Sequence, residues 1–257
     1  MDIPIFHINV FTDQTFAGNP AAVCLLDEWP EDDVLQAIAN QNQLSETAFV
    51  DVDDMRLRWF TPKTEVDLCG HATLAAAFVL FDAGAGLTEV SFKTISGEFL
   101  VTAENDQIVL HFPAFPTVAC DADPRLSDAL GGAPPELWQS RSAYVAVYGA
   151  EADVLALQPD MEGLARCPKD RVIVTAPGDE VDFVSRFFAP ALGVPEDPVT
   201  GSAHCTLAPF WAARLGRTRL RARQVSARGG ALECEVYADG VRIAGRAVRY
   251  LAGEITI

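Results

Sequence analysis

The fold is decided by two stretches of sequence, LCGHATLAAAF (residues 68–78) and VTGSAHCTLAPF (residues 199–210). In each stretch a glycine-containing turn leads into an apolar run, which predicts helices over 71–81 and 202–215. Both runs are apolar nearly all round, as is typical of a helix buried on every side. Aligning Gly70 with Gly201 superimposes the two runs, although two alanine-rich helices can also be alike by chance.

Strand-like segments surround both helices in a similar order. Around the first helix, strands are expected over 3–11, 23–26, 44–50, 57–60, 90–92, 99–103 and 108–112, with another helix from Pro30. Around the second, strands are expected over 144–148, 171–175, 182–188, 232–237 and 241–244, with a helix over 152–157 and a turn at Asp239–Gly240. The shared order predicts a duplicated α+β architecture, with each helix enclosed by the strands of its half.

The boundary between the two halves is expected in the Pro- and Ala-rich segment 113–135. This gives an N-terminal half over 1–116 and a C-terminal half over 117–257. The last strand, from about Ala247, can return to the N-terminal half.

The composition excludes several classes of protein. A net charge of −17 over 257 residues repels nucleic acid and anionic membranes, so neither is expected as a partner. No apolar run reaches the roughly 18–20 residues of a membrane span, and the first residues, MDIPIFHINVF, indicate a strand rather than a secretory signal. The six cysteines are scattered without a CxxC pair, which favours reduced thiols in a cytoplasmic protein.

The starts of the two apolar helices are candidate anion sites. A helix start leaves backbone N–H groups unpaired and carries partial positive charge, so it binds carboxylates and developing enolates. Gly70 and Gly201 allow close backbone approach, while His71 and Ser202 add side-chain donors or acceptors. The pattern predicts a pair of anion-binding helix starts that hold a small carboxylic acid.

Two carboxylates are candidate proton carriers. In QLSETAFV, strand alternation puts Glu46 on the more apolar face with Ala48 and Val50, although a glutamate at a strand end can also reach solvent. Asp197 directly precedes the second helix, where a capping or loop aspartate is equally consistent with the pattern.

Other chemistries find less support. Cys69-x-His71 and His204–Cys205 invite a zinc site, but His204 and Cys205 point in different directions on a helix, and no metal is expected. Neither GxGxxG nor GxxxxGK[ST] occurs, so no nucleotide cofactor is expected. Nucleophilic hydrolysis through Cys69 stays open, because a helix start lowers the pKa of a thiol.

Five segments together closely resemble the PhzF-like family, the phenazine-biosynthesis isomerases and their relatives with the diaminopimelate epimerase fold. They are VFTDQTFAGNPAAV (10–23), QLSETAFV (43–50), RWFTPKTEVDLCGHATLAAA (58–77), PEDPVTGSAHCTLAPFW (195–211) and QVSARGGALECEV (224–236). The resemblance implies two similar halves, each a β-barrel-like sheet around a central helix, with the active site between them and a homodimeric assembly.

The resemblance also implies site residues. It places the acid/base on Glu46 and a substrate-lining role on four further residues, which are Gly70, His71, Asp197 and Ser202. Racemases of this fold place a thiol at each helix start, whereas here the second such position is Thr200, which disfavours a two-thiol mechanism. Gln43 departs from the asparagine common in the family before Leu-Ser-Glu.

Together these features predict a cofactor-independent isomerase that moves a proton on a small dihydro-hydroxyanthranilate-like acid. Catalysis is assigned to Glu46, His71 and Asp197, and substrate binding to Gly70, Gly201 and Ser202. The alternatives are a racemase or epimerase of an amino or hydroxy acid, and a non-catalytic protein of this fold that binds small acids.

Overall fold

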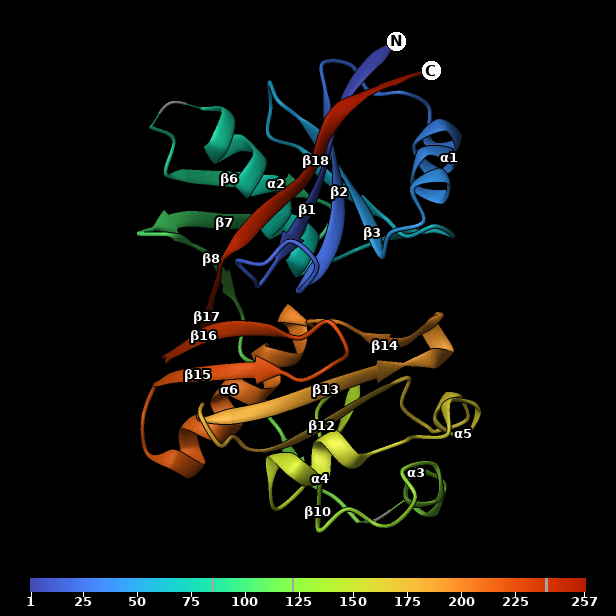
Figure 1. The fold of residues 1–257 in the computed structure, drawn as a ribbon, viewed down its shortest axis with the longest axis vertical. Helices are drawn as coiled ribbons and strands as arrows, with labels where there is room; N and C mark the ends of the chain where they lie inside the picture. The colour runs from blue at the N-terminus through green and yellow to red at the C-terminus, as the bar shows by residue number, and fades with distance from the viewer. Residues whose placement is uncertain (85, 122, 239) are drawn as a thin grey trace. The chain divides into compact units, whose positions relative to one another are not determined.

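The last strand of the chain pairs with the first. In the computed structural model, which describes residues 1–84, 86–121, 123–238 and 240–257, β18 (Ala247–Thr256) runs antiparallel to β1 (Asp2–Val10) along all of β1. The two termini meet at the end of this pair, where the Met1 amino group donates a hydrogen bond to the Ile257 carbonyl at 2.7 Å (Figure 1). The chain forms two compact units. Because β18 pairs with β1, the first unit consists of residues 1–111 together with 244–257, and the second consists of residues 112–243.

The first unit is built on a six-stranded sheet of order β18-β1-β2-β3-β4-β5. Its remaining strands are β2 (Asn19–Leu26), β3 (Glu46–Asp51), β4 (Leu57–Phe60) and β5 (Glu65–Val66). Helix α1 (Asp32–Asn42) links β2 to β3, which run parallel. Three antiparallel strands follow, namely β6 (Glu89–Thr94), β7 (Gly97–Glu104) and β8 (Gln107–Phe112).

Helix α2 (Gly70–Ala83) forms the core of this unit. It packs against β1, β2, β3 and β18 of the sheet and against β7. Its alanines let the strands approach closely, and Leu74 is fully buried among them. Alternate residues of the strands point to the other face of the sheet, where Ile5, Ala22 and Phe49 pack with Leu35 of α1.

The second unit repeats this plan. Its strands follow the order β17-β16-β15-β13-β12-β11-β10-β9, with β14 paired to β13. They are β9 (Val118–Ala119), β10 (Glu136–Gln139), β11 (Ala143–Val147), β12 (Arg171–Pro177), β13 (Phe183–Ala189), β14 (Val194–Asp197), β15 (Arg219–Gln224), β16 (Gly230–Tyr237) and β17 (Gly240–Gly245). The short helices are α3 (Pro124–Ala129), α4 (Glu151–Ala156), α5 (Met161–Ala165) and a 3-10 turn (Pro190–Leu192). Strands β11 and β12 are parallel and joined through α4 and α5, as β2 and β3 are through α1.

Helix α6 (Gly201–Leu215) is the central helix of the second unit and packs on β15 and β16. Its Trp211 stacks on Phe183 and donates a hydrogen bond from Nε1 to Thr175 Oγ1 at 2.9 Å. Pro209 lies inside the helix, where it has no N–H to offer the carbonyl of Cys205. That carbonyl instead accepts the Phe115 N–H at 2.9 Å. This hydrogen bond connects the first segment of the unit to its central helix, and it is possible because Pro209 leaves the carbonyl without a partner inside the helix.

The architecture confirms the predicted α+β fold of two similar halves, each with strands around a central helix. The helices expected over 71–81 and 202–215 run over Gly70–Ala83 and Gly201–Leu215. The elements that were not predicted are strands β5, β9, β10, β14 and β15 and helices α3 and α5. The turn expected at Asp239–Gly240 includes Asp239, which lies outside the described residues.

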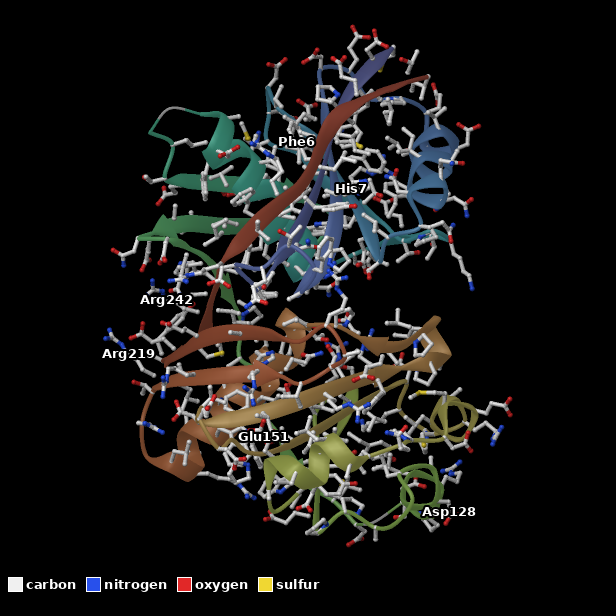
Figure 2. All side chains as sticks on the ribbon, viewed as in Figure 1. Phe6, His7, Asp128, Glu151, Arg219 and Arg242 are labelled. Atoms are coloured by element: carbon white, nitrogen blue, oxygen red, sulfur yellow. The ribbon has the colours of Figure 1, made fainter. Side chains whose placement is uncertain are left out.

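Charged side chains on the strands form ion pairs across neighbouring strands. Arg219 and Arg242, both labelled in Figure 2, pair with Glu235 between them on β16, at 3.0 and 2.9 Å. Such exposed pairs contribute little to stability, so the fold depends on its two cores. None of the helices in the described ranges is long and apolar enough to span a membrane.

Replacing Leu74 by alanine should remove about 2–5 kcal/mol from the free energy of unfolding, because the enclosing strands cannot collapse into the space left behind. The matched control is Leu251→Ala on β18, where the side chain is 40% exposed and the loss should stay below about 1 kcal/mol. Urea unfolding followed by tryptophan fluorescence measures both. Equal losses in the two variants would contradict a core centred on α2.

Candidate active site

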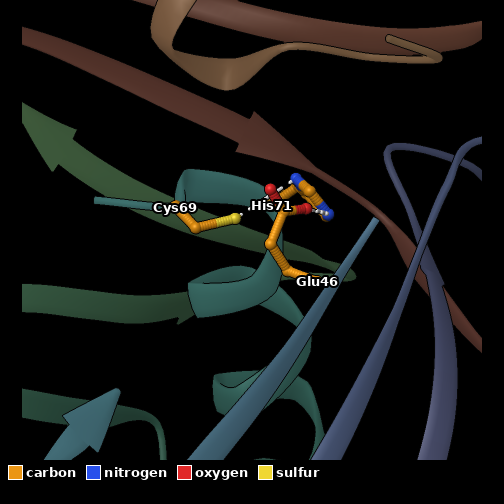
Figure 3. A group of neighbouring side chains, drawn as sticks. All are labelled: Glu46, Cys69 and His71. Atoms are coloured by element: carbon orange, nitrogen blue, oxygen red, sulfur yellow. Dashed lines mark hydrogen bonds and ion pairs between the residues drawn. The ribbon is translucent and has the colours of Figure 1, made fainter. Parts of the chain in front are cut away.

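The Glu46 carboxylate and the His71 imidazole meet inside the first unit (Figure 3). Glu46 Oε2 lies 3.1 Å from His71 Nε2, and the two side chains are 16% and 7% exposed. Glu46 is the first residue of β3, and His71 is the second residue of α2. Because β3 packs against α2, the start of the strand meets the start of the helix.

The turn before β3 sets where the strand begins. Gln43 ends α1 in the left-handed conformation, with φ 52° and ψ 26°. Asparagine adopts this conformation more readily than glutamine, which gives a physical reason for the asparagine expected here from the family resemblance. The presence of glutamine instead of asparagine at position 43 therefore affects the turn and leaves the Glu46 carboxylate in place.

Cys69 contacts the other nitrogen of the imidazole ring. It is the N-cap residue of α2, and its Sγ lies 3.4 Å from His71 Nδ1. Thr73 fixes the backbone at this point, because its N–H and its hydroxyl both donate to the Cys69 carbonyl, at 3.1 and 2.7 Å. The ring thus contacts a thiol through one nitrogen and a carboxylate through the other.

These neighbours govern the protonation of the ring. Burial lowers the pKa of His71, but the Cys69 sulfur and the Glu46 carboxylate both raise it, so that it lies well above its ordinary value of 6.5. Burial raises the pKa of the Cys69 thiol, the Glu46 charge raises it further, and His71 acts in the opposite direction. The contacts with Cys69 and Glu46 therefore favour the protonated, cationic form of His71.

The facing atoms of this pair are an exception to the rule that buried polar atoms are hydrogen-bonded. Glu46 Oε2 and His71 Nε2 are both buried and, among the described residues, neither has a hydrogen-bond partner. Their 3.1 Å contact is an ion pair without the alignment of a hydrogen bond. Each of these two buried atoms therefore has the other as its close polar partner.

Glu46, Cys69 and His71 are also the one group of metal-ligand type found within the described ranges. One ligand-type atom of each residue lies within 4.8 Å of the others, but Sγ contacts Nδ1 and the carboxylate contacts Nε2, so the two partners use different nitrogens of the ring. An ion binds one imidazole nitrogen, and the contacts therefore suit a proton relay better than a closed metal site.

A second cluster lies at the start of α6 in the other unit. Asp197 ends β14 and is 9% exposed, and the Thr200 hydroxyl donates to Asp197 Oδ2 in a short hydrogen bond. Gln224, which is fully buried, accepts the Thr200 N–H at 2.9 Å. Its amide also donates to the Asp197 carbonyl at 2.7 Å and to Thr200 Oγ1 at 3.2 Å. Gln224 thereby holds the turn that leads into the helix.

The first residues of α6 differ sharply in exposure. Gly201 is buried, Ser202 is exposed and His204 is fully buried. His204 Nδ1 contacts the Thr200 carbonyl at 2.8 Å, and burial lowers the pKa of the ring to about 4. His204 is therefore neutral and structural, while Ser202 is the side chain open to a ligand.

The structure thus divides the predicted site residues between two clusters. Glu46, Gly70 and His71 come together in the first unit, and Asp197, Gly201 and Ser202 lie together around the start of α6 in the second. Sequence reasoning missed Gln224. The only available signal was its place at the head of QVSARGG, one of the segments that carried the family resemblance.

A separate groove of about 600 Å³ lies in the first unit between α1 and the end of β18. Asp33, Val34 and Asn42 of α1 line it together with Ile255 and Ile257. None of the predicted site residues contributes to this groove.

Comparison with known proteins identifies the family. The sequence model of the family described as phenazine biosynthesis-like protein, PhzC–PhzF, matches residues 8–253. The chain belongs to this family. An uncharacterised isomerase of Pseudomonas aeruginosa is 50% identical over 99% of this chain and 99% of its own. The crystal structure of a PhzF-family phenazine biosynthesis protein from Enterococcus faecalis matches with a TM-score of 0.97 at 43% identity, over 100% of both chains.

These matches confirm the PhzF-like resemblance predicted from the five segments, and the chain is an isomerase. A probable proline racemase from Agrobacterium radiobacter matches with a TM-score of 0.69 at 12% identity, over 99% of this chain and 93% of its own. That likeness extends to the fold alone, which PhzF-like proteins share with racemases.

Replacing Gln224 by leucine should destabilise the second unit by about 1–3 kcal/mol, because the buried Thr200 N–H loses its acceptor. Gln158→Leu is the control, since Gln158 is exposed in the same unit. Urea unfolding of both variants gives the comparison. A Gln224→Leu protein as stable as the control would show that the hydrogen bonds of Gln224 do not contribute to stability.

His204 should make the protein less stable in acid. Its folded pKa of about 4 lies below the ordinary 6.5, so the unfolded state takes up a proton first as the pH falls. From about pH 7.5 to about pH 4.5, the wild type should lose about 2–3 kcal/mol more stability than His204→Gln. Denaturant titrations at the two pH values measure this difference, and equal losses in both proteins would refute it.

Proposed function

We propose that this PhzF-like isomerase moves a proton on a small carboxylic acid of the dihydro-hydroxyanthranilate type, without a cofactor. The observation that carries the proposal is the buried contact of Glu46 with His71, in which the facing oxygen and nitrogen have no hydrogen-bond partner among the described residues. A carboxylate held in this way next to a cation is suited to take a proton from carbon and return it.

The proton shift needs two transfers. In the first, Glu46 takes a proton from an activated carbon, and the electron pair of the C–H bond spreads into the conjugated acid. In the second, the carboxyl group of Glu46 returns the proton to a different carbon of the same molecule. No proton, electron or group is lost, so the reaction needs no co-reactant.

The helix starts and the imidazolium stabilise the charge between these transfers. The raised pKa of His71 keeps the ring cationic at neutral pH, and the N–H groups at the start of α2 add partial positive charge. We assign Gly70, Gly201 and Ser202 to binding of the substrate carboxylate, and Asp197 to a polar group of the same substrate. Ser202 supports this assignment because it is exposed, whereas the Thr200 hydroxyl is already bonded to Asp197.

The same bond bears on the racemase alternative. A two-base racemase needs a second acid/base group at the start of α6, and Thr200 fills that position with a hydroxyl that does not ionise near neutral pH. Proton transfer through a single carboxylate is therefore the mechanism that we favour.

The proposal also places the enzyme in the cytoplasm as a homodimer. All six cysteines are free thiols, which fits a reducing compartment. The homodimer rests on the family resemblance, and sedimentation of the purified protein tests it directly.

Replacing Glu46 by glutamine should lower kcat on a dihydro-hydroxyanthranilate by about 10²–10⁴-fold, because the amide cannot accept the proton. The fold should persist, since glutamine has nearly the same shape. Glu89→Gln on the exposed edge of β6 is the matched control and should retain full activity. Turnover is followed by proton NMR in deuterated water.

Three outcomes would overturn parts of the proposal. Near wild-type turnover in Glu46→Gln would remove Glu46 as the proton carrier. Deuterium entering a stereocentre that inverts, with no shifted double bond, would establish the epimerase alternative. Binding of the acid by the wild type without any exchange would establish the non-catalytic alternative.

A further inference from the structure

Cys69 has no part in the proton shift proposed above, yet it contacts the residue on which that reaction depends. Its Sγ lies 3.4 Å from His71 Nδ1, whereas Glu46 contacts the other ring nitrogen, Nε2. The thiol, the imidazole and the carboxylate form a compact cluster, in which one sulfur, nitrogen or oxygen atom of each residue lies within 4.8 Å of the others (Figure 3). A nucleophile, a base and an orienting acid are combined in the same way in covalent catalysis.

Burial argues against the use of this cluster in covalent catalysis. Cys69 is 6% exposed, and burial raises the pKa of its thiol, whereas a nucleophilic cysteine is an accessible thiolate. The open alternative of hydrolysis through Cys69 therefore loses support. What remains is exchange of a proton between sulfur and ring.

The ring has few other charged neighbours. Among the described residues, the groups that act on the protonation of His71 are Glu46, from β3, and Cys69, from the N-cap of α2. Both raise the pKa of the ring, and the influence of Cys69 is the larger. Groups that interact this strongly share their protons and titrate together.

We propose that Cys69 is a third acid/base group of this site, and that it shares one proton with His71 across the contact between Sγ and Nδ1. The S–H bond breaks as the Nδ1–H bond forms, giving a thiolate and an imidazolium, so no proton is gained or lost and no oxidant is needed. This inference rests on the proposed function for its role in catalysis.

That role follows from what happens to the carboxylate. When Glu46 takes the substrate proton it becomes neutral, and His71 loses the anion on its Nε2 side. The sulfur at Nδ1 then still accepts a hydrogen bond from the ring and holds its charge and orientation until the proton is returned. Cys69 thus acts on the substrate through His71, as a positioning residue.

The titration of the His71 ring, followed by NMR of ¹⁵N-labelled protein without substrate, tests the proposal. The signals are assigned by comparison with His71→Asn. In Cys69→Ala the proton affinity of the ring should fall about tenfold or more. In Cys69→Ser it should fall less, because a hydroxyl can accept the Nδ1–H hydrogen bond but does not ionise in this range.

Cys24→Ala is the matched control. Cys24 is a fully buried thiol of the same unit, on β2, and burial alone raises its pKa to about 12. This variant should leave the His71 titration unchanged. An unchanged titration in Cys69→Ala, or an equal change in Cys24→Ala, would overturn the proposal.

The thiol can be followed as well, should Cys69→Ala fail to fold. Thiolate absorbance of the wild type and of His71→Asn, each against its Cys69→Ser counterpart, isolates the titration of Cys69. Loss of the ring should raise the pKa of the thiol, and an unchanged thiol titration would count against a shared proton.

Kinetics then separate this inference from the proposed function. If the wild type turns over the acid, Cys69→Ala should displace the pH profile of kcat by the same amount as the ring titration, with Cys69→Ser between the two. A displaced titration of the His71 ring in an enzyme that is inactive on the acid would support the shared proton of Cys69 and His71. It would refute the proposed function. An undisplaced pH profile of kcat in an active enzyme would refute the positioning role of Cys69.

Discussion

The site depends above all on the burial of α2. A helix enclosed by strands must end its hydrogen-bonding ladder inside the protein, where water cannot satisfy the first N–H groups. The residues at that end are therefore placed under two constraints, which are to fit a crowded space and to tolerate a partial positive charge. His71 and Cys69 occupy this end, and the first side chain of β3, Glu46, supplies the negative charge that the position favours.

The start of α6 meets the same constraints with different chemistry. Here the N-cap residue is Thr200, and a buried amide, Gln224, takes its N–H and holds the Asp197 carbonyl. The network is neutral apart from Asp197, and His204 in the next turn is kept neutral by burial. The start of α2 thus carries a cluster of titratable groups, whereas the start of α6 carries a network of hydrogen bonds around Gln224. This asymmetry supports our proposal that the first cluster transfers the proton and the second binds the substrate.

The elements that sequence reasoning recovered are those with a strong local signal. The two apolar helices stand out because their composition suits burial on all sides, and most strands show alternation or a bounding turn. Strand β15, RLRARQ, was missed because three of its six residues are arginines, and only alternate residues such as Leu220 and Ala222 face the core. The short helices α3 and α5 have six and five residues, which is less than two turns and too little for a hydrophobic period to appear. Their local signs are the aspartate caps, Asp123 and Asp160, and Pro124 at the start of α3.

The candidate site was predictable in its residues but not in its couplings. Glu46 could have reached solvent from a strand end, and only packing of β3 against α2 turns it toward His71. The partnership of Cys69 with His71 spans two positions in sequence, yet it depends on the ring rotamer, which no spacing rule supplies. Gln224 is further still from the turn that it holds, and hydrogen bonds between distant segments leave no periodic trace. These couplings decide which groups carry charge at neutral pH, and so the step from a list of site residues to a mechanism needs the three-dimensional structure.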